Sequence, residues 1–176
     1  MAKLGYTFDS RFRPHWLSYV LQSALAAVAV FAALAALRQQ NLVVAASLAA
    51  TAFTVFAMPS SVTASPRNVV GGHMIGLAFG SVFALLPHDS GLGQDALYAS
   101  AVGCSMLAMA VTDTEHSPAA GTALGVVIAG FSAQVVFGVV LGVGILSVIH
   151  RLLRPVLRDL VAAPEQGGDG IPPSAV

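Results

Sequence analysis

The chain has 176 residues, of which 56% are hydrophobic and only 9% are charged, with eight basic and eight acidic side chains. Soluble domains carry about a quarter charged residues, so this composition argues against a soluble globular domain. The balanced charge provides no basic field for nucleic acid, and the single cysteine, Cys104, excludes both an intramolecular disulfide framework and a cysteine-based zinc site.

Long apolar runs dominate the sequence. Each is close to or beyond the length of about 20 residues that a helix needs to cross about 30 Å of hydrocarbon. Because such runs satisfy their backbone groups in lipid as helices, the sequence predicts an all-α, polytopic membrane bundle of about five transmembrane helices. We expect this bundle in a bacterial cytoplasmic (inner) membrane. The runs are Leu17 to Leu37, Leu42 to Met58, Val69 to Leu86, Ala96 to Thr112 and Gly121 to Ile149.

Basic residues near both ends conflict with five crossings. Lys3, Arg11 and Arg13 favour a cytoplasmic N-terminus by the positive-inside rule, and three arginines after residue 150 favour the same side for the C-terminus. The last run is too long for one untilted crossing, and its polar interruption at Ser132-Ala133-Gln134 could be a break. We retain five helices with the N-terminus inside, and the side of the C-terminus stays open.

Charge and composition divide the chain into four parts. The last part is rich in proline, glycine and polar residues, which is typical of disorder. The parts are a cytoplasmic N-terminal segment at 1–16, a transmembrane helical domain at 17–150, a basic interfacial segment at 151–163 and a disordered tail at 164–176.

Two connections between apolar runs look alike. Each contains a Ser-Pro pair, Ser65-Pro66 in one and Ser117-Pro118 in the other, directly before an apolar helix. Serine is a preferred N-cap and proline is favoured at the first helical position, so both pairs predict helix starts. The similarity suggests two related helix-loop-helix units.

Glycines recur at steps of four in the helices that follow these pairs. Such a spacing makes one face of a membrane helix flat enough for close backbone packing. His73 lies beside this face, about two turns into its helix, so we expect it within the membrane and facing protein rather than lipid. The predicted packing residues are Gly72, Gly76, Gly80, Gly121 and Gly125.

The sequences at the two Ser-Pro connections contain motifs that resemble those of a known family, the HPP integral membrane proteins. The run P-R-N-V-V-G-G-H at 66–73 resembles that family's P-R-N-x-x-G-G-H signature. The run H-S-P-A-A-G-T at 116–122 resembles the stretch that names the family, with Ser117 in place of the first of two prolines. The resemblance covers roughly residues 15–150. Because plant and cyanobacterial members are associated with nitrite transport, it implies transport of a small anion.

The residues themselves are compatible with an anion site. A helix N-terminus offers free N-H groups and about half a positive charge, and Arg67 adds a fork of donors suited to a planar oxyanion such as nitrite. The expected partners are the lipid bilayer and a small inorganic anion, and a thin bundle is compatible with a homo-oligomer. We expect no cofactor and no metal. The candidate substrate-binding residues are Ser65, Arg67, Asn68, His73, His116, Ser117 and Thr122.

Other interpretations remain open. Arg67 could simply mark the cytoplasmic side, and His73 could be a packing histidine. A compact, glycine-rich bundle is also what a structural or assembly subunit would look like. A membrane-embedded metal-dependent enzyme is less favoured. Its site would be built from Asp113, Glu115, His116 and His73, but the adjacent pair Glu115-His116 does not have the ligand spacing of a zincin motif. We therefore do not expect an enzyme.

Overall fold

The apolar runs of the sequence form helices. The computed structural model describes residues 12–37, 42–87 and 91–161, and these residues contain α-helices, one short 3-10 helix and connecting loops, with no strand. This confirms the predicted all-α class. The elements are α1 (Phe12–Leu37), α2 (Leu42–Ala57), η1 (Val62–Ala64), α3 (Pro66–Ala84), α4 (Leu92–Val111), α5 (Ser117–Ala129) and α6 (Ala133–Leu153).

The described residues contain six α-helices, where the sequence predicted about five, because the last apolar run contains two. α5 ends at Gly130, whose φ of +80° lies in the left-handed region that L side chains rarely adopt. α6 then begins after Ser132, whose side chain accepts a hydrogen bond of 3.3 Å from the Gln134 amide. The polar interruption noted in the sequence is therefore a true helix break.

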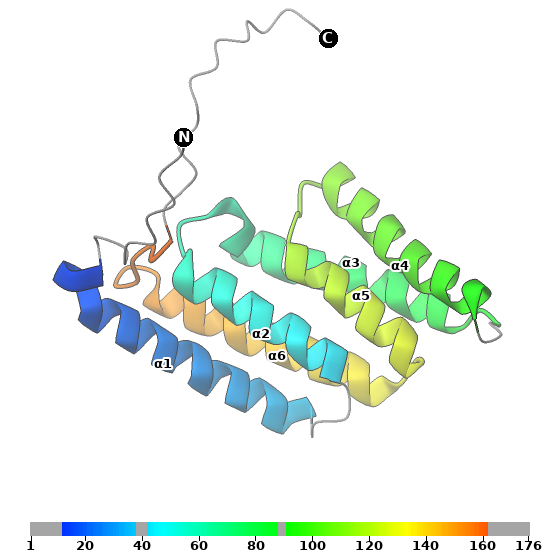
Figure 1. Cartoon of the computed structure of the whole chain (residues 1–176), viewed down its shortest axis with the longest axis horizontal. Helices are drawn as coiled ribbons and strands as arrows, with labels where there is room; N and C mark the ends of the chain where they lie inside the picture. Colours follow the sequence, from blue (N-terminus) through cyan, green and yellow to red (C-terminus); the bar gives the residue numbers. More distant parts are fainter. Residues whose placement is uncertain (1–11, 38–41, 88–90, 162–176) are drawn as a thin grey trace, which may run out of the picture.

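The sixth helix changes the end of the bundle at which the last helix finishes. Successive helices run back and forth, so the start of α1 and the end of α6 lie at the same end of the bundle, toward the left of Figure 1. Arg13 and Arg154 consequently lie at the same end, which the positive-inside rule favours and which five crossings could not provide. Lys3 and Arg11 lie outside the described residues.

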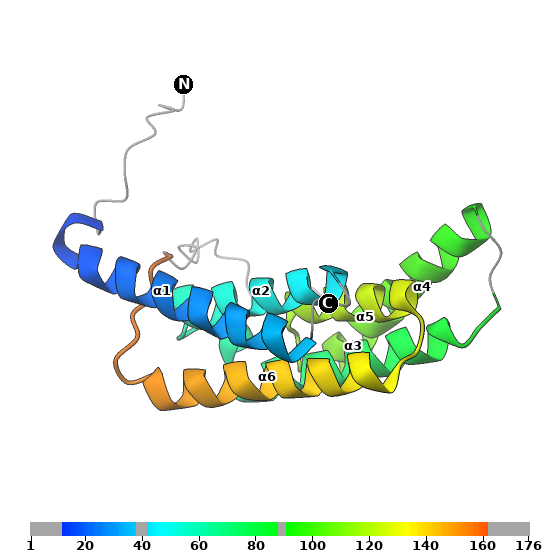
Figure 2. The ribbon, with the colours of Figure 1, turned by 90° about the horizontal axis from the view of Figure 1, so that it is seen from below.

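Helix α5 packs against α2, α3 and α4, while α1 packs against α2 and α6 (Figures 1 and 2). The glycine steps make these contacts close. A Cβ added at Gly72 would lie 2.8 Å from the His116 Cβ, and one at Gly80 would lie 2.7 Å from the Ala123 carbonyl oxygen. The glycine face of α3 thus packs on α5.

The opposite face of α5 packs on α2 through the second glycine pair. A Cβ at Gly125 would lie 2.8 Å from the Val44 backbone nitrogen, and one at Gly121 would lie 3.3 Å from the Ser47 Cβ. Small residues on two faces of one helix bring three backbones together, as is common in membrane bundles.

Large apolar side chains face outward. Trp16, Phe31 and Phe137 are each more than half exposed. Among the described residues, two helices are long and apolar enough, by length and composition, to cross a membrane, namely Phe12–Ala35 of α1 and Ala133–Leu153, which is α6. An apolar exterior around a core of small residues is the arrangement expected of a helical bundle in lipid.

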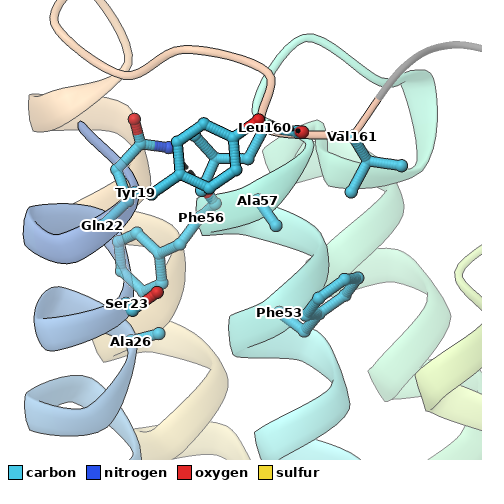
Figure 3. A pocket seen from close by; sticks show the side chains of 9 residues that line it. All are labelled: Tyr19, Gln22, Ser23, Ala26, Phe53, Phe56, Ala57, Leu160 and Val161. Carbon is cyan, nitrogen blue, oxygen red and sulfur yellow. Dashed lines mark hydrogen bonds between the residues drawn. The ribbon is translucent and has the colours of Figure 1, made fainter. Parts of the chain in front are cut away.

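The segment after α6 folds back onto α1 and α2. The Gln22 side chain donates to the Arg158 carbonyl (2.8 Å) and accepts from its amide (3.1 Å), and the Leu160 amide donates to the Ala57 carbonyl (2.8 Å). A mostly apolar cavity of about 250 Å³ lies beneath this segment (Figure 3). Helix α1 begins at Phe12, inside the predicted segment 1–16. The predicted tail at 164–176 lies outside the described residues.

Candidate functional site

The two motif-bearing connections meet at one end of the bundle. The His116 Nδ1 donates to the Thr63 carbonyl oxygen at 2.8 Å, and the Asn68 side chain donates to the Glu115 carbonyl oxygen at 3.1 Å. These bonds join the start of α3 to the start of α5, so both connections lie at the same end.

The start of α3 matches its predicted cap. The Ser65 hydroxyl accepts from the Asn68 amide at 3.3 Å and donates to the Asn68 side-chain oxygen at 2.9 Å, and Pro66 opens the helix. The Asn68 side chain is buried. Both residues therefore use their polar atoms to hold the helix start and its neighbouring loop.

The start of α5 differs from its predicted cap. His116, not Ser117, occupies the N-cap position, and its side chain makes no cap hydrogen bond. Its backbone is extended, and its ring contacts the Thr63 carbonyl and Thr51 instead of the first turn of α5. Ser117 is the first residue of the helix and is exposed.

Arg67 lies on the surface and already has an acidic partner. Its guanidinium donates to the Asp113 carboxylate at 2.8 Å and to the Thr112 carbonyl oxygen at 3.1 Å. Both charged side chains are largely exposed, at 63% and 75%. Arg67 thus ties the first turn of α3 to the end of α4.

Five buried side chains form a continuous line of hydrogen bonds between α2, α3 and α5, which we call the buried polar chain. The His73 ring contacts the Thr51 hydroxyl through Nε2 and the Thr122 hydroxyl through Nδ1, each at 2.8 Å. The Thr51 hydroxyl also lies 3.0 Å from the His116 Nε2. Thr122 contacts the Ser47 hydroxyl at 2.7 Å. The members are Ser47, Thr51, His73, His116 and Thr122.

His73 is fully buried between protein helices, which confirms the prediction that it faces protein. Ser47 and Thr51 were not predicted as site residues. The signal that could have identified them is their spacing, because two hydroxyl residues four apart on an apolar helix share one face.

The seven predicted binding residues thus lie in one region but in three settings. Ser65 and Asn68 form a helix cap, while His73, His116 and Thr122 belong to the buried polar chain. Arg67 and Ser117 are on the surface. Among the described residues, no group of three or more His, Cys, Asp or Glu side chains could hold a metal ion.

A surface pocket of about 290 Å³ reaches the edge of this region. It lies between α4 and α5, and one member of the buried polar chain, His116, is among its lining residues. Its lining is mostly apolar and consists of Met106, Met109, Ala110, Glu115, His116, Ser117 and Ala120.

Comparison with known proteins places the chain in a family. The family described as "HPP, transmembrane region" matches residues 11–160. Two transmembrane proteins of Dictyostelium discoideum are similar: one is 35% identical over 89 residues, covering 51% of this chain and 31% of the relative. The other is 33% identical over 78 residues, covering 44% and 25%. The matches thus span a third or less of these relatives, and no solved structure matches. As the motifs at 66–73 and 116–122 predicted, the chain belongs to the HPP family of integral membrane proteins.

Proposed function

We propose that this protein is a membrane transporter or channel for a small anion, with a nitrite-like oxyanion as the favoured substrate class. One observation carries the proposal: α3 and α5 begin side by side at the same end of the bundle, joined by the Asn68–Glu115 and His116–Thr63 bonds. The first turns of both helices therefore present amide groups and positive dipole ends in one region. The association of HPP proteins with nitrite transport points to the same class.

The energetics require several donors together. The idealised cost of moving a small ion out of water into a protein interior is of order 20 kcal/mol, whereas one helix end contributes about 0.3–2 kcal/mol. Arg67, at the first turn of α3, supplies the formal charge that the helix ends lack. Because Arg67 binds Asp113 in this structure, an arriving anion would replace that carboxylate on the guanidinium.

A flux screen tests the proposal directly. Purified protein in liposomes should carry nitrite, and the rates for nitrate, formate and chloride should show how strongly the path selects a planar oxyanion. Empty liposomes and liposomes with heat-denatured protein give the background. Folded protein that carries none of the four anions would contradict a transporter and favour a structural or assembly subunit. The bacterial cytoplasmic membrane stays an expectation that localisation in the source cell would test.

A further inference from the structure

The buried polar chain ends on a carbonyl oxygen at both of its ends. Ser47 Oγ donates to the Pro118 carbonyl at 2.6 Å, and His116 Nδ1 donates to the Thr63 carbonyl at 2.8 Å. Carbonyl oxygens only accept hydrogen bonds, so neither end of the chain can supply a hydrogen. Every hydrogen in the chain must come from the five side chains between these ends.

Counting hydrogens gives a deficit of one. Six contacts link the two carbonyls through the five side chains, and all six distances lie between 2.6 and 3.0 Å. A neutral serine, threonine or histidine side chain brings one hydrogen each, which makes five hydrogens for six contacts. One contact would then join two lone pairs at hydrogen-bonding distance, which is unfavourable in a buried site.

One additional proton removes the deficit. If either imidazole is doubly protonated, His73 or His116, six hydrogens serve six contacts and every polar atom of the chain has a partner. The Thr51 hydroxyl joins the two Nε2 atoms, accepting from the protonated ring and donating to the neutral one. The charge passes from one ring to the other when the protonated Nε2 gives its hydrogen to the Thr51 oxygen and the Thr51 hydroxyl hydrogen passes to the other Nε2.

A second additional proton is opposed by charge. The Thr51 hydroxyl also lies 3.0 Å from the Ser47 carbonyl oxygen, which keeps a lone pair beside its regular helical bond and can accept the hydroxyl hydrogen. If Thr51 donates there, one of its contacts with the two rings lacks a hydrogen, which a second proton would supply. Two imidazolium rings with centroids 5.1 Å apart would repel each other in a buried site. The geometry therefore fits one added proton for the pair of rings.

Among the described residues, the elements around the buried polar chain contribute no acidic side chain to it. α2, η1 and α5 have no titratable side chains, and α3 adds only Arg67, which binds Asp113. The loop before α5 carries Asp113 and Glu115, both exposed. The remaining titratable groups on the elements packed against α3 and α5 are Asp95, Tyr98 and Cys104 of α4 and His150 and Arg151 of α6.

We infer that Ser47, Thr51, His73, His116 and Thr122 form a binding site for one proton, shared by the two imidazoles through the Thr51 hydroxyl. The proton comes from water at the adjoining end of the bundle and forms an N–H bond at the Nε2 of either ring. Burial opposes the resulting positive charge, and completion of the hydrogen-bond chain favours it. An anion nearby would add a compensating negative charge.

This inference gives the proposed transporter a coupling ion, and that extension alone rests on the proposed function. A proton on the buried polar chain and a monovalent anion at the adjacent helix starts together carry no net charge. We therefore expect one proton to accompany each monovalent anion. Proton binding itself follows from the hydrogen count and does not require transport.

Histidine nitrogen NMR tests the site without measuring transport. Protein labelled with ¹⁵N in its histidine rings is titrated in micelles from about pH 9 to about pH 4, the range that brackets an ordinary imidazole. We expect the Nε2 signals of His73 and His116 to shift together over one transition that takes up one proton, while both Nδ1 atoms stay protonated. Adding nitrite should move this transition to higher pH.

Three variants of α2 test whether the Thr51 hydroxyl links the two histidine rings. Thr51→Val removes the shared hydroxyl, so the two rings should no longer titrate together and the proton affinity should fall by roughly tenfold or more. Thr51→Ser keeps the hydroxyl and should behave like the wild type. Thr54→Val is the matched control, because the Thr54 hydroxyl donates only to the Ala50 carbonyl of its own helix (3.1 Å).

The inference is overturned if neither ring takes up a proton over this range, or if the rings titrate independently and Thr51→Val leaves them unchanged. The two proposals can fail separately. Joint titration in a protein that carries no anion supports the proton site and contradicts the transporter. Anion flux in a protein whose rings do not titrate supports the transporter and contradicts the proton site.

Discussion

Arg67 is the residue whose role the structure makes most open to experiment. Its side chain is exposed and paired with Asp113, and exposed ion pairs contribute only about 0.2–1 kcal/mol to stability. Removing the pair should therefore leave the protein folded. The anion flux of Arg67 variants then distinguishes a residue that binds the anion from one that only ties α3 to the end of α4.

We expect Arg67→Gln to lower nitrite flux at least tenfold, because a hydrogen bond to a charged group contributes about 1.5–3 kcal/mol. Arg67→Lys should keep part of the flux, since the charge remains without the planar fork. Rates in liposomes at equal amounts of folded protein provide the measurement. Nitrite flux at wild-type rates in both variants would leave Arg67 only a marker of membrane orientation.

Asp113→Asn is the reciprocal variant. Asp113 has a φ of +54°, a conformation that asparagine tolerates well, so the backbone should be retained. Without the competing carboxylate, Arg67 should bind the anion more readily, and half-saturation should occur at a lower nitrite concentration. If Arg67 and Asp113 act only as a clamp, both variants should instead change flux and thermal stability in the same direction.

Single residues also show what local sequence reasoning can reach. The Ser65 cap and the inward position of His73 followed from signals within one turn of helix, namely Ser-Pro spacing and glycine steps. The Arg67–Asp113 pair joins residues 46 apart in sequence, and no local pattern indicates it. The same holds for Thr51, whose role depends on two rings from other elements.

At the scale of elements, the contact between α3 and α5 depends on the absence of side chains. A Cβ at Gly76 would collide with the Ala119 carbonyl oxygen, so even alanine cannot enter without moving a helix. Gly103, in α4, has nothing within 4 Å of its added Cβ. These two glycines form a matched pair, because both lie inside helices and only one is at a close contact.

We expect Gly76→Ala to destabilise the protein by about 1–3 kcal/mol, the usual cost of overpacking. Gly103→Ala should be neutral or stabilising by up to about 1 kcal/mol, because alanine is the better helix former. Thermal unfolding in detergent, followed by circular dichroism, measures both. Equal unfolding temperatures for the two variants would count against close packing of α3 on α5.

The helix break at Gly130 shows why element counts are difficult in membrane sequences. Glycine is frequent inside transmembrane helices, so Gly130 alone does not distinguish a break from a packing position. The serine at 132 was the better signal, because its hydroxyl caps α6. The α5 start shows the reverse case, in which a strong Ser-Pro signal placed the helix correctly but assigned the cap to Ser117 instead of His116.

At the scale of the molecule, the six α-helices of the described residues remove the conflict between the arginines at the two ends that five helices left open. An even number of antiparallel helices returns the chain to the end at which it began, so arginines near both ends can lie on one side (Figure 1). Overall class and family could be predicted from composition and two short motifs. The end at which the chain leaves the bundle depended on one helix break, which hydropathy alone does not detect.

This arrangement predicts which residues are accessible from each side of the membrane. Val62, in η1, and Glu115, before α5, lie at the same end as the start of α1, whereas Phe131 lies in the connection at the opposite end; all three side chains are exposed. By the positive-inside rule, cysteines at 62 and 115 should be labelled from the cytoplasmic side, and one at 131 from the other side. Each cysteine is placed singly in a Cys104→Ala background, with permeabilised cells as the control for reactivity. Labelling of positions 62 and 115 from opposite sides would contradict the fold. Labelling of 131 from the same side as both would mean that α5 does not cross the bilayer.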